Sequence, residues 1–128
     1  MSRILNQFQL KNTLFYLASC DTCRKIIKSL PKDLSLVYHD IKQNPITTAQ
    51  LEEMKALAGS YEALFSKKAQ LYKAMDLKHK SLTEADYKKY LLEHYTFLSR
   101  PVFIIEDQIY IGNTQQNILL VTKALANV

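Results

Sequence analysis

Two cysteines lie three positions apart in the segment Cys20-Asp21-Thr22-Cys23, between an apolar run and a stretch with helical spacing. Thiols at this spacing suit thiol–disulfide exchange, in which one thiolate attacks and the other resolves the mixed disulfide. Cys20 falls at the start of the predicted helix, where free N–H groups and the helix dipole favour an anion, and Arg24 and Lys25 add positive charge. We therefore predict a lowered pKa for Cys20, the nucleophile, with Cys23 as the resolving thiol.

Two other interpretations of the cysteine pair remain open. A zinc site needs about two further ligands, but the chain has no third cysteine, and its histidines His39, His79 and His94 are far apart in the sequence. We therefore expect no metal. Alternatively, Cys23 is only a small buried apolar side chain and Cys20 alone reacts.

A second candidate for chemistry is the pair Arg100-Pro101. The bond that precedes a proline can be cis at modest cost, usually in a tight turn. A guanidinium holds an oxyanion through paired hydrogen bonds. If the third strand opens beside the cysteine helix, Arg100 comes close to Cys20. The alternative is an exposed arginine before a structural proline.

The elements around the cysteines predict a parallel start to a sheet. Residues 13–17 form a short apolar run typical of a buried strand, and a helix with Ile26, Ile27 and Leu30 follows the cysteines until Pro31. Apolar residues alternate again over 34–38, which predicts a second strand ending near residues 39–40. A strand, helix and strand in this order form a right-handed crossover with parallel strands.

A helical segment follows, at about residues 47–97. Thr47 or Thr48 can cap a helix that ends at Gly59, and residues 61–75 fit one or two short helices. Thr83 and Asp86 have the spacing of a capping box. The apolar side chains of the helix that they begin are expected at Tyr87, Tyr90, Leu91 and Tyr95.

The last elements complete the fold prediction. Strands are expected at 102–105 and 109–111, joined by a tight turn, and a final helix follows with Ile118, Val121 and Leu125 on one face. The order β-α-β, helical insertion, β-β-α predicts the α/β class and a thioredoxin-like fold with a four-stranded mixed sheet. We expect residues 1–128 to form one such domain.

Charge and hydropathy narrow the possible partners. The net charge is +5, and much of the excess lies within residues 67–89. Such a region can attract an anion or an acidic partner, or can simply be a solvated lysine-rich helical surface. The chain shows no motif that reads nucleic acid, so we expect no direct DNA binding. It has no signal-peptide pattern and no apolar run of about 20 residues, so we expect a cytoplasmic protein that does not enter the membrane.

Several short motifs together resemble the ArsC/Spx family. The resemblance covers about residues 13–126. This family contains glutaredoxin-coupled arsenate reductases and Spx-type regulators that bind RNA polymerase. The motifs, in order, are Cys20-Asp21-Thr22-Cys23-Arg24-Lys25, Ala63-Leu64-Phe65-Ser66-Lys67-Lys68, Leu98-Ser99-Arg100-Pro101 and Ile111-Gly112.

The resemblance implies roles for individual residues. Cys20 matches the nucleophile of the reductases, and Arg24 and Arg100 match arginines of the family's motifs, which implies that they bind the oxyanion. Lys68, or Lys67, stands where the family has an arginine in the helical insertion. The last arginine of the reductases has no counterpart here, and a lysine offers a point charge in place of a bidentate fork.

The resemblance thus implies two functions. The first is an oxidoreductase that reduces an oxyanion or a disulfide, with Cys20 attacking and either Cys23 or glutathione resolving. It needs no bound cofactor, and its reductant is glutathione, another small thiol or glutaredoxin. The alternative is an Spx-like redox-sensing transcriptional regulator that binds RNA polymerase through a Cys20–Cys23 disulfide switch.

Overall fold

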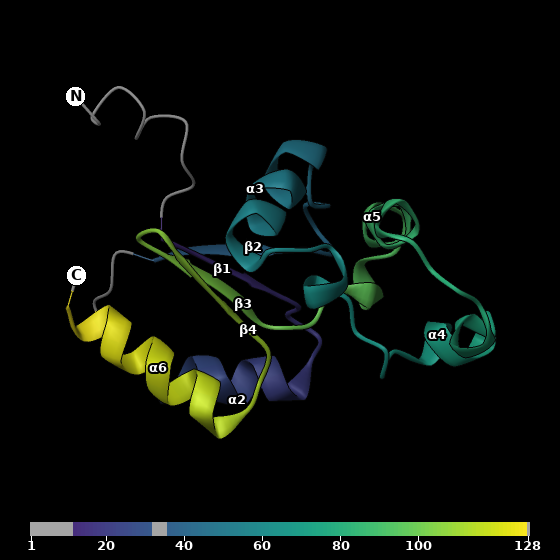
Figure 1. The fold of residues 1–128 in the computed structure, drawn as a ribbon. Coiled ribbons are helices and arrows are strands. Elements are labelled where there is room, and N and C mark those ends of the chain that lie inside the picture. Colours follow the sequence, from purple (N-terminus) through teal and green to yellow (C-terminus); the bar gives the residue numbers. More distant parts are fainter. Residues whose placement is uncertain (1–11, 32–35, 128) are drawn as a thin grey trace, which may run out of the picture.

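The computed structural model describes residues 12–31 and 36–127, which form a four-stranded mixed sheet of order β2-β1-β3-β4 (Figure 1). Strand β1 (Thr13–Tyr16) pairs in parallel with β2 (Val37–Asp40) and antiparallel with β3 (Val102–Ile105). Strand β3 continues through a tight turn into its antiparallel partner β4 (Gln108–Ile111). The predicted α/β class and mixed thioredoxin-like sheet are confirmed.

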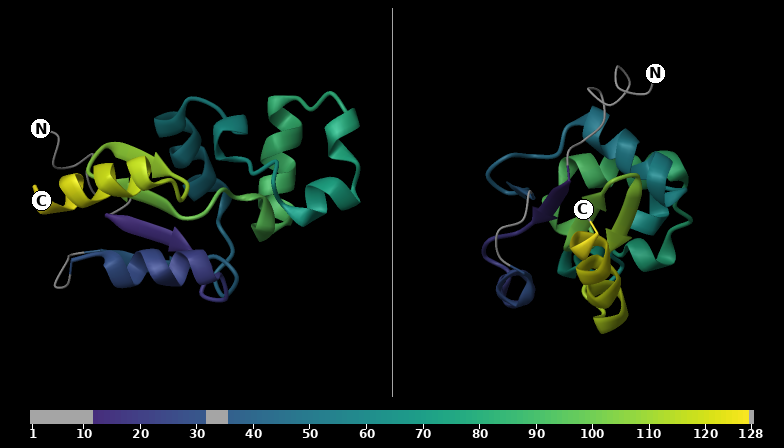
Figure 2. Two further views of the ribbon diagram at one scale, coloured as in Figure 1. Left: turned by 90° about the horizontal axis from the view of Figure 1, so that it is seen from below. Right: turned by 90° about the vertical axis from the view of Figure 1, so that its left-hand side faces the viewer.

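Helices cover both faces of this sheet. Helices α2 (Asp21–Ser29) and α6 (Gln115–Ala126) lie together on one face, and α3 (Thr48–Ala58) lies on the other (Figures 1 and 2). Between α3 and β3 the chain makes further short helices, which extend past the end of the sheet. They are η1 (Glu62–Leu64), α4 (Gln70–Ala74), η2 (Leu77–His79), α5 (Glu84–Glu93) and η3 (Tyr95–Phe97). No helix within 12–31 and 36–127 is long and apolar enough to cross a membrane.

The strands build a core on each side of the sheet because their side chains alternate in direction. In β1, Phe15 packs on the α3 side and Leu14 on the side of α2 and α6. In β3, Val102 and Ile104 face the first side, and Phe103 faces the second. The whole of β3 is buried, as expected for a central strand with helices on both faces.

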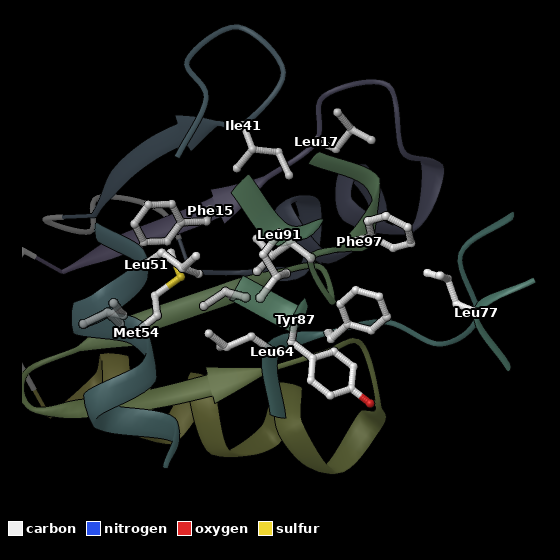
Figure 3. Packing of buried hydrophobic residues seen from close by; sticks show 14 residues of the cluster. Phe15, Leu17, Ile41, Leu51, Met54, Leu64, Leu77, Tyr87, Leu91 and Phe97 are labelled. Carbon is white, nitrogen blue, oxygen red and sulfur yellow. The ribbon is translucent and has the colours of Figure 1, made fainter. Parts of the chain in front are cut away.

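The larger core joins the sheet to the helical segment (Figure 3). Its centre is a stack of Phe65 on Phe97, with ring centroids 4.7 Å apart, and Tyr87 meets Phe65 edge-on at 4.9 Å. Leu64 and Leu91 pack into the same cluster. The insertion therefore shares one hydrophobic core with the sheet that carries the cysteines.

The predicted start and end of α3 and the predicted start of α5 are confirmed. Thr47 caps α3 through a reciprocal capping box with Gln50, and Gly59 ends it at φ +98°, a conformation that glycine adopts without a Cβ clash. Thr83 and Asp86 form the expected capping box of α5. These local signals are strong because each satisfies N–H or C=O groups that the helix leaves free.

Two predicted boundaries differ. Helix α5 ends at Glu93 because His94 takes an extended conformation, so Tyr95 lies in η3, partly exposed, and does not share the face of Tyr87 and Leu91. The second strand begins at Val37, later than expected, and is an edge strand with Val37 and Tyr38 exposed. The expected start at 34–35 lies outside the described residues. That residues 1–128 form a single domain also stays a prediction.

Candidate active site around two cysteines and Arg100

Cys20 stands where β1 gives way to α2, at the N-cap of the helix. Its N–H donates to the carbonyl of Leu17 (3.0 Å), which closes a turn, and its own carbonyl accepts the N–H of Arg24 (3.0 Å). The thiol is half-buried and packs at the margin of the larger core. The order of strand, cysteines and helix thus places a partly accessible thiol at a helix N-terminus.

The surroundings of Cys20 favour its thiolate. Burial on its own raises the pKa of Cys20. Contacts with the N–H and thiol of Cys23, the N–H of Thr22 and the positive charge of Arg100 outweigh that effect and lower the pKa below its ordinary value. The predicted direction of the shift is confirmed. Hydrogen bonds from Cys23 and Thr22 lower the pKa most, and the arginine whose charge adds to their effect is Arg100.

The surroundings of Cys23, in contrast, favour its protonated thiol. Its side chain is 1% exposed, and burial raises its pKa to about 11, with a further increase from the negative charge of Cys20. At neutral pH it is therefore a thiol that can donate a hydrogen bond to the Cys20 sulfur. Both cysteines are free, and their side chains are in contact. The two thiols are thus unequal, with an activated outer sulfur and a protonated inner one.

Arg100 lies beside this pair, preceding a cis peptide bond to Pro101. Its Nη1 donates to the carbonyls of Thr96 (3.1 Å) and Leu98 (3.3 Å), which fix the guanidinium. Its Nε is buried and makes no hydrogen bond with the described residues. The charge of Arg100 lowers the pKa of both thiols, so its electrostatic field reaches the cysteine pair as the sequence predicts.

Arg100 also lines a pocket of about 400 Å³. Among the described residues, three cationic side chains line it and no acidic one does. Its wall includes the residues just before α6. Cys20 is not one of its lining residues, so Arg100 links the thiols to the pocket. The lining residues are Phe65, Ser66, Lys67, Lys68, Ser99, Arg100, Gly112, Asn113 and Thr114.

Both candidate lysines line this pocket, but they differ in their contacts. The ammonium of Lys67 lies 2.7 Å from the carboxylate of Glu62, and that hydrogen bond raises the pKa of Lys67 and lowers that of Glu62. Lys68 forms no ion pair with the described residues, and its backbone N–H donates to Ser66 Oγ (3.3 Å). Lys68 is therefore the lysine whose charge is more available to an anion.

Arg24 has different surroundings from the other predicted site residues. Its guanidinium donates to the carbonyl of Ala18 (2.8 Å) and pairs with the carboxylate of Asp21, and it does not line the pocket. The structure thus brings Cys20, Cys23 and Arg100 together and places Lys68 with Arg100 in the pocket. A role for Arg24 as an oxyanion ligand stays a prediction from the sequence.

Asn113 and Thr114 complete the pocket and belong to none of the motifs that predict the site. Thr114 caps α6 by accepting the N–H of Asn117 (3.1 Å), and Asn117 Nδ2 donates to the carbonyl of Gly112 (2.8 Å). The Thr114-x-x-Asn117 spacing signals the helix start, but nothing local shows that this start faces Ser66 and Ser99. In residues 12–31 and 36–127, no three or more His, Cys, Asp or Glu side chains group in a way that could hold a metal ion.

Comparison with known proteins identifies a matching family and similar folds. The model of the ArsC family matches residues 15–121. The solved structure of the YffB (PA3664) protein has a TM-score of 0.76 at 20% identity, over 90% of this chain and 99% of that one.

Two further solved structures carry arsenate reductase in their names. An arsenate reductase from Vibrio cholerae gives a TM-score of 0.72 at 16% identity, over 88% of this chain and 99% of that one. An arsenate reductase (ArsC) related protein from Brucella melitensis gives a TM-score of 0.68 at 17% identity, over 90% of this chain and 97% of that one. At these identities the likeness shows the fold. Comparison with curated proteins gives no match.

Proposed function

The chain belongs to the ArsC family, and from that premise we propose that it is a thiol-dependent oxidoreductase with Cys20 as its nucleophile. The observation that carries the proposal is the pair of unequal thiols at the start of α2. Cys20 has a lowered pKa and is partly accessible, whereas Cys23 is buried with a pKa of about 11. A thiolate and a neighbouring protonated thiol supply an attacking and a resolving sulfur.

Reduction of a disulfide follows directly from this arrangement. The Cys20 thiolate attacks one sulfur of the substrate and displaces the other as a thiolate, which leaves a mixed disulfide on Cys20. Cys23 then loses its proton and attacks the Cys20 sulfur, releasing the second substrate thiolate and forming a Cys20–Cys23 disulfide. Two molecules of glutathione, or one dithiol glutaredoxin, return that disulfide to two thiols and become oxidised to a disulfide themselves.

Reduction of arsenate also needs two thiols. Arsenate accepts two electrons and loses one oxygen as water, while two thiols become a disulfide. Cys20 supplies one thiol and glutathione or Cys23 the other. The cations Arg100 and Lys68 support this substrate because both line the pocket and both can stabilise negative charge. So does the match to the ArsC family.

The size of the pocket favours a larger substrate than an inorganic oxyanion alone. Pockets for small organic ligands have volumes of about 300–1,000 Å³, and this pocket has about 400 Å³. Its cationic lining suits the carboxylates of a glutathione mixed disulfide. We therefore place a glutathione-bearing disulfide first and arsenate second, with glutathione or glutaredoxin as reductant, in the reducing cytoplasm and without a bound cofactor.

A coupled assay tests the proposal. NADPH consumption is followed with glutathione and glutathione reductase, with either a small glutathione mixed disulfide or millimolar arsenate, the latter with glutaredoxin. We expect turnover that Cys20→Ser reduces by at least about a hundredfold, because the attacking sulfur is gone. Cys23→Ser is the matched control, since it removes a thiol from the same helix but leaves the nucleophile. Turnover that is equal in wild type and Cys20→Ser on both substrates contradicts the proposal.

A second candidate function is that of an Spx-like redox sensor that binds RNA polymerase. It is favoured by the contact between the Cys20 and Cys23 side chains, because an oxidant can close such a pair into a disulfide with no further substrate. Its test is copurification with RNA polymerase before and after diamide treatment. The sensor requires a complex whose stability changes on oxidation and no longer changes in Cys23→Ser.

A further inference from the structure

Arg24 makes two contacts that hold the loop around Cys20. One terminal nitrogen of its guanidinium donates to the carbonyl of Ala18 at 2.8 Å, and the other pairs with the carboxylate of Asp21. Both partners flank Cys20, two residues before it and one residue after it. Both terminal nitrogens of the Arg24 guanidinium thus bind acceptors in the loop around Cys20.

The first contact joins the loop to the helix. Ala18 lies inside the turn that the Cys20 N–H closes on Leu17, and Arg24 reaches this turn from the first turn of α2. The backbone N–H of Arg24 also donates to the carbonyl of Cys20 (3.0 Å). Arg24 therefore holds this loop in two ways. Its side chain binds the residue two positions before Cys20, and its backbone N–H binds Cys20 itself.

The second contact concerns charge. Asp21 follows Cys20 directly, and an uncompensated carboxylate next to a thiol disfavours the thiolate. Its pairing with Arg24 offsets that effect at the point where the helix N-terminus stabilises the anion. Both side chains are at least half exposed, so the contribution is one of local geometry and field and not of fold stability.

We propose that Arg24 is a positioning residue that clamps the loop before Cys20 and neutralises Asp21, and that it is not a ligand of the substrate anion. This inference rests on the proposed function only in taking Cys20 as the reactive sulfur. The charge that acts directly on the thiols and lines the pocket is that of Arg100. A planar guanidinium serves two acceptors at fixed angles, which an ammonium group does not.

The pH dependence of Cys20 alkylation tests the clamp without any substrate. Rates of reaction with iodoacetamide are measured from pH 5 to 10 for wild type, Arg24→Ala, Arg24→Lys and Lys25→Ala. We expect Arg24→Ala to move the profile to higher pH and to lower the rate at pH 7 by about threefold or more, because less thiolate is present. We expect the pH profile and the rate at pH 7 of Arg24→Lys to lie between those of wild type and Arg24→Ala.

Lys25→Ala is the matched control, because it removes an equal charge from the same helical turn. We expect it to shift the profile by less than half as much. Equal shifts in Arg24→Ala and Lys25→Ala overturn the proposal, since the effect is then one of overall charge. A wild-type profile for Arg24→Lys also overturns it, since the fork is then not needed.

Anion binding distinguishes a clamp from a ligand. Sulfate is titrated as a probe, and calorimetry gives its dissociation constant. We expect this constant to stay within twofold in Arg24→Ala and to increase at least tenfold in Arg100→Ala. Weaker sulfate binding in Arg24→Ala with an unshifted pH profile overturns the proposal. Alkylation and calorimetry need no turnover, so failure of the coupled assay leaves these results interpretable.

Discussion

At the scale of single residues, the site shows how position separates two identical side chains. Cys20 and Cys23 are three residues apart on one helix, yet the pKa of the first is lowered and that of the second is raised to about 11. Cys20 sits at the helix start with N–H groups around its sulfur, whereas Cys23 is one turn further on and buried. Environment alone thus makes the two thiols unequal in acidity.

This difference predicts a two-step pH dependence of alkylation. Because Cys20 ionises below the ordinary range and Cys23 is half-ionised only at about pH 11, iodoacetamide should modify one thiol per molecule up to about pH 9. In Cys20→Ser the negative charge that raises the pKa of Cys23 is gone, so that pKa should fall below 11. Burial remains, so it should stay above the ordinary value.

Mass spectrometry of the alkylated protein at each pH gives the two profiles. Cys23→Ser is the control, and it should retain a single low-pH step. Alkylation of both cysteines over one shared pH range contradicts the inequality of the two thiols.

At the scale of elements, two helix N-termini serve the site in different ways. The start of α2 holds Cys20, and the start of α6 forms one wall of the cationic pocket. Thr114 caps α6 and lines the pocket at the same time. The N-terminal dipole of this 12-residue helix adds to the field of Arg100 and Lys68 at that wall.

Replacing the cap of α6 should therefore affect both stability and anion binding. Thr114→Ala removes the acceptor for the Asn117 N–H, and we expect unfolding in urea to become easier by about 0.5–2 kcal/mol. Sulfate affinity, measured by calorimetry, should fall severalfold, because the helix start at the pocket frays.

Thr47→Ala removes an equivalent cap from α3, whose start does not line the pocket, and is the matched control. It should lose similar stability and keep its sulfate affinity. Equal losses of sulfate affinity in the two variants contradict a role of α6 in the pocket.

At the scale of the whole molecule, two segments that are far apart in the sequence are joined next to the pocket. The backbone N–H of Ser66 donates to Phe97 (2.7 Å) and that of Ser99 donates to Leu64 (2.8 Å), with Phe65 bridging to Leu98. One of the two joined segments leads directly into Lys67 and Lys68, and the other leads into Arg100. The stack of Phe65 on Phe97 fills the space beneath.

A cavity at this attachment should destabilise the whole fold. Phe97 is fully buried, and Phe97→Ala should lower the free energy of unfolding by about 3–5 kcal/mol in urea titration. Phe97→Leu leaves a smaller cavity and should lower the free energy of unfolding by less. Leu119→Ala, on the exposed face of α6, is the control and should cost little. A loss for Phe97→Ala no larger than that of this control contradicts a shared core.

Much of this arrangement could be predicted from the sequence. The order of strands and helices, the capping boxes at Thr47 and Thr83, and the place of Cys20 at a helix start all follow from local patterns. The end of α5 and the exposure of Tyr95 could not be predicted, because His94 breaks the helix without a glycine or proline to signal it. The sequence could not show which of Lys67 and Lys68 has its charge available to an anion. That depends on the ion pair of Lys67 with Glu62, which only the folded structure reveals.

By itself, the sequence determined that two thiols stand at a strand–helix junction in a mixed sheet, since apolar periodicity and capping are read from neighbouring residues. The tertiary structure alone decided which arginine acts on them. Arg24 is near Cys20 in sequence but binds its own loop, whereas Arg100, eighty residues away, contributes a positive charge that lowers the pKa of both thiols. The pocket likewise joins three distant segments. Burial and charge depend on which distant residues converge, and that depends on how the sheet and helices pack.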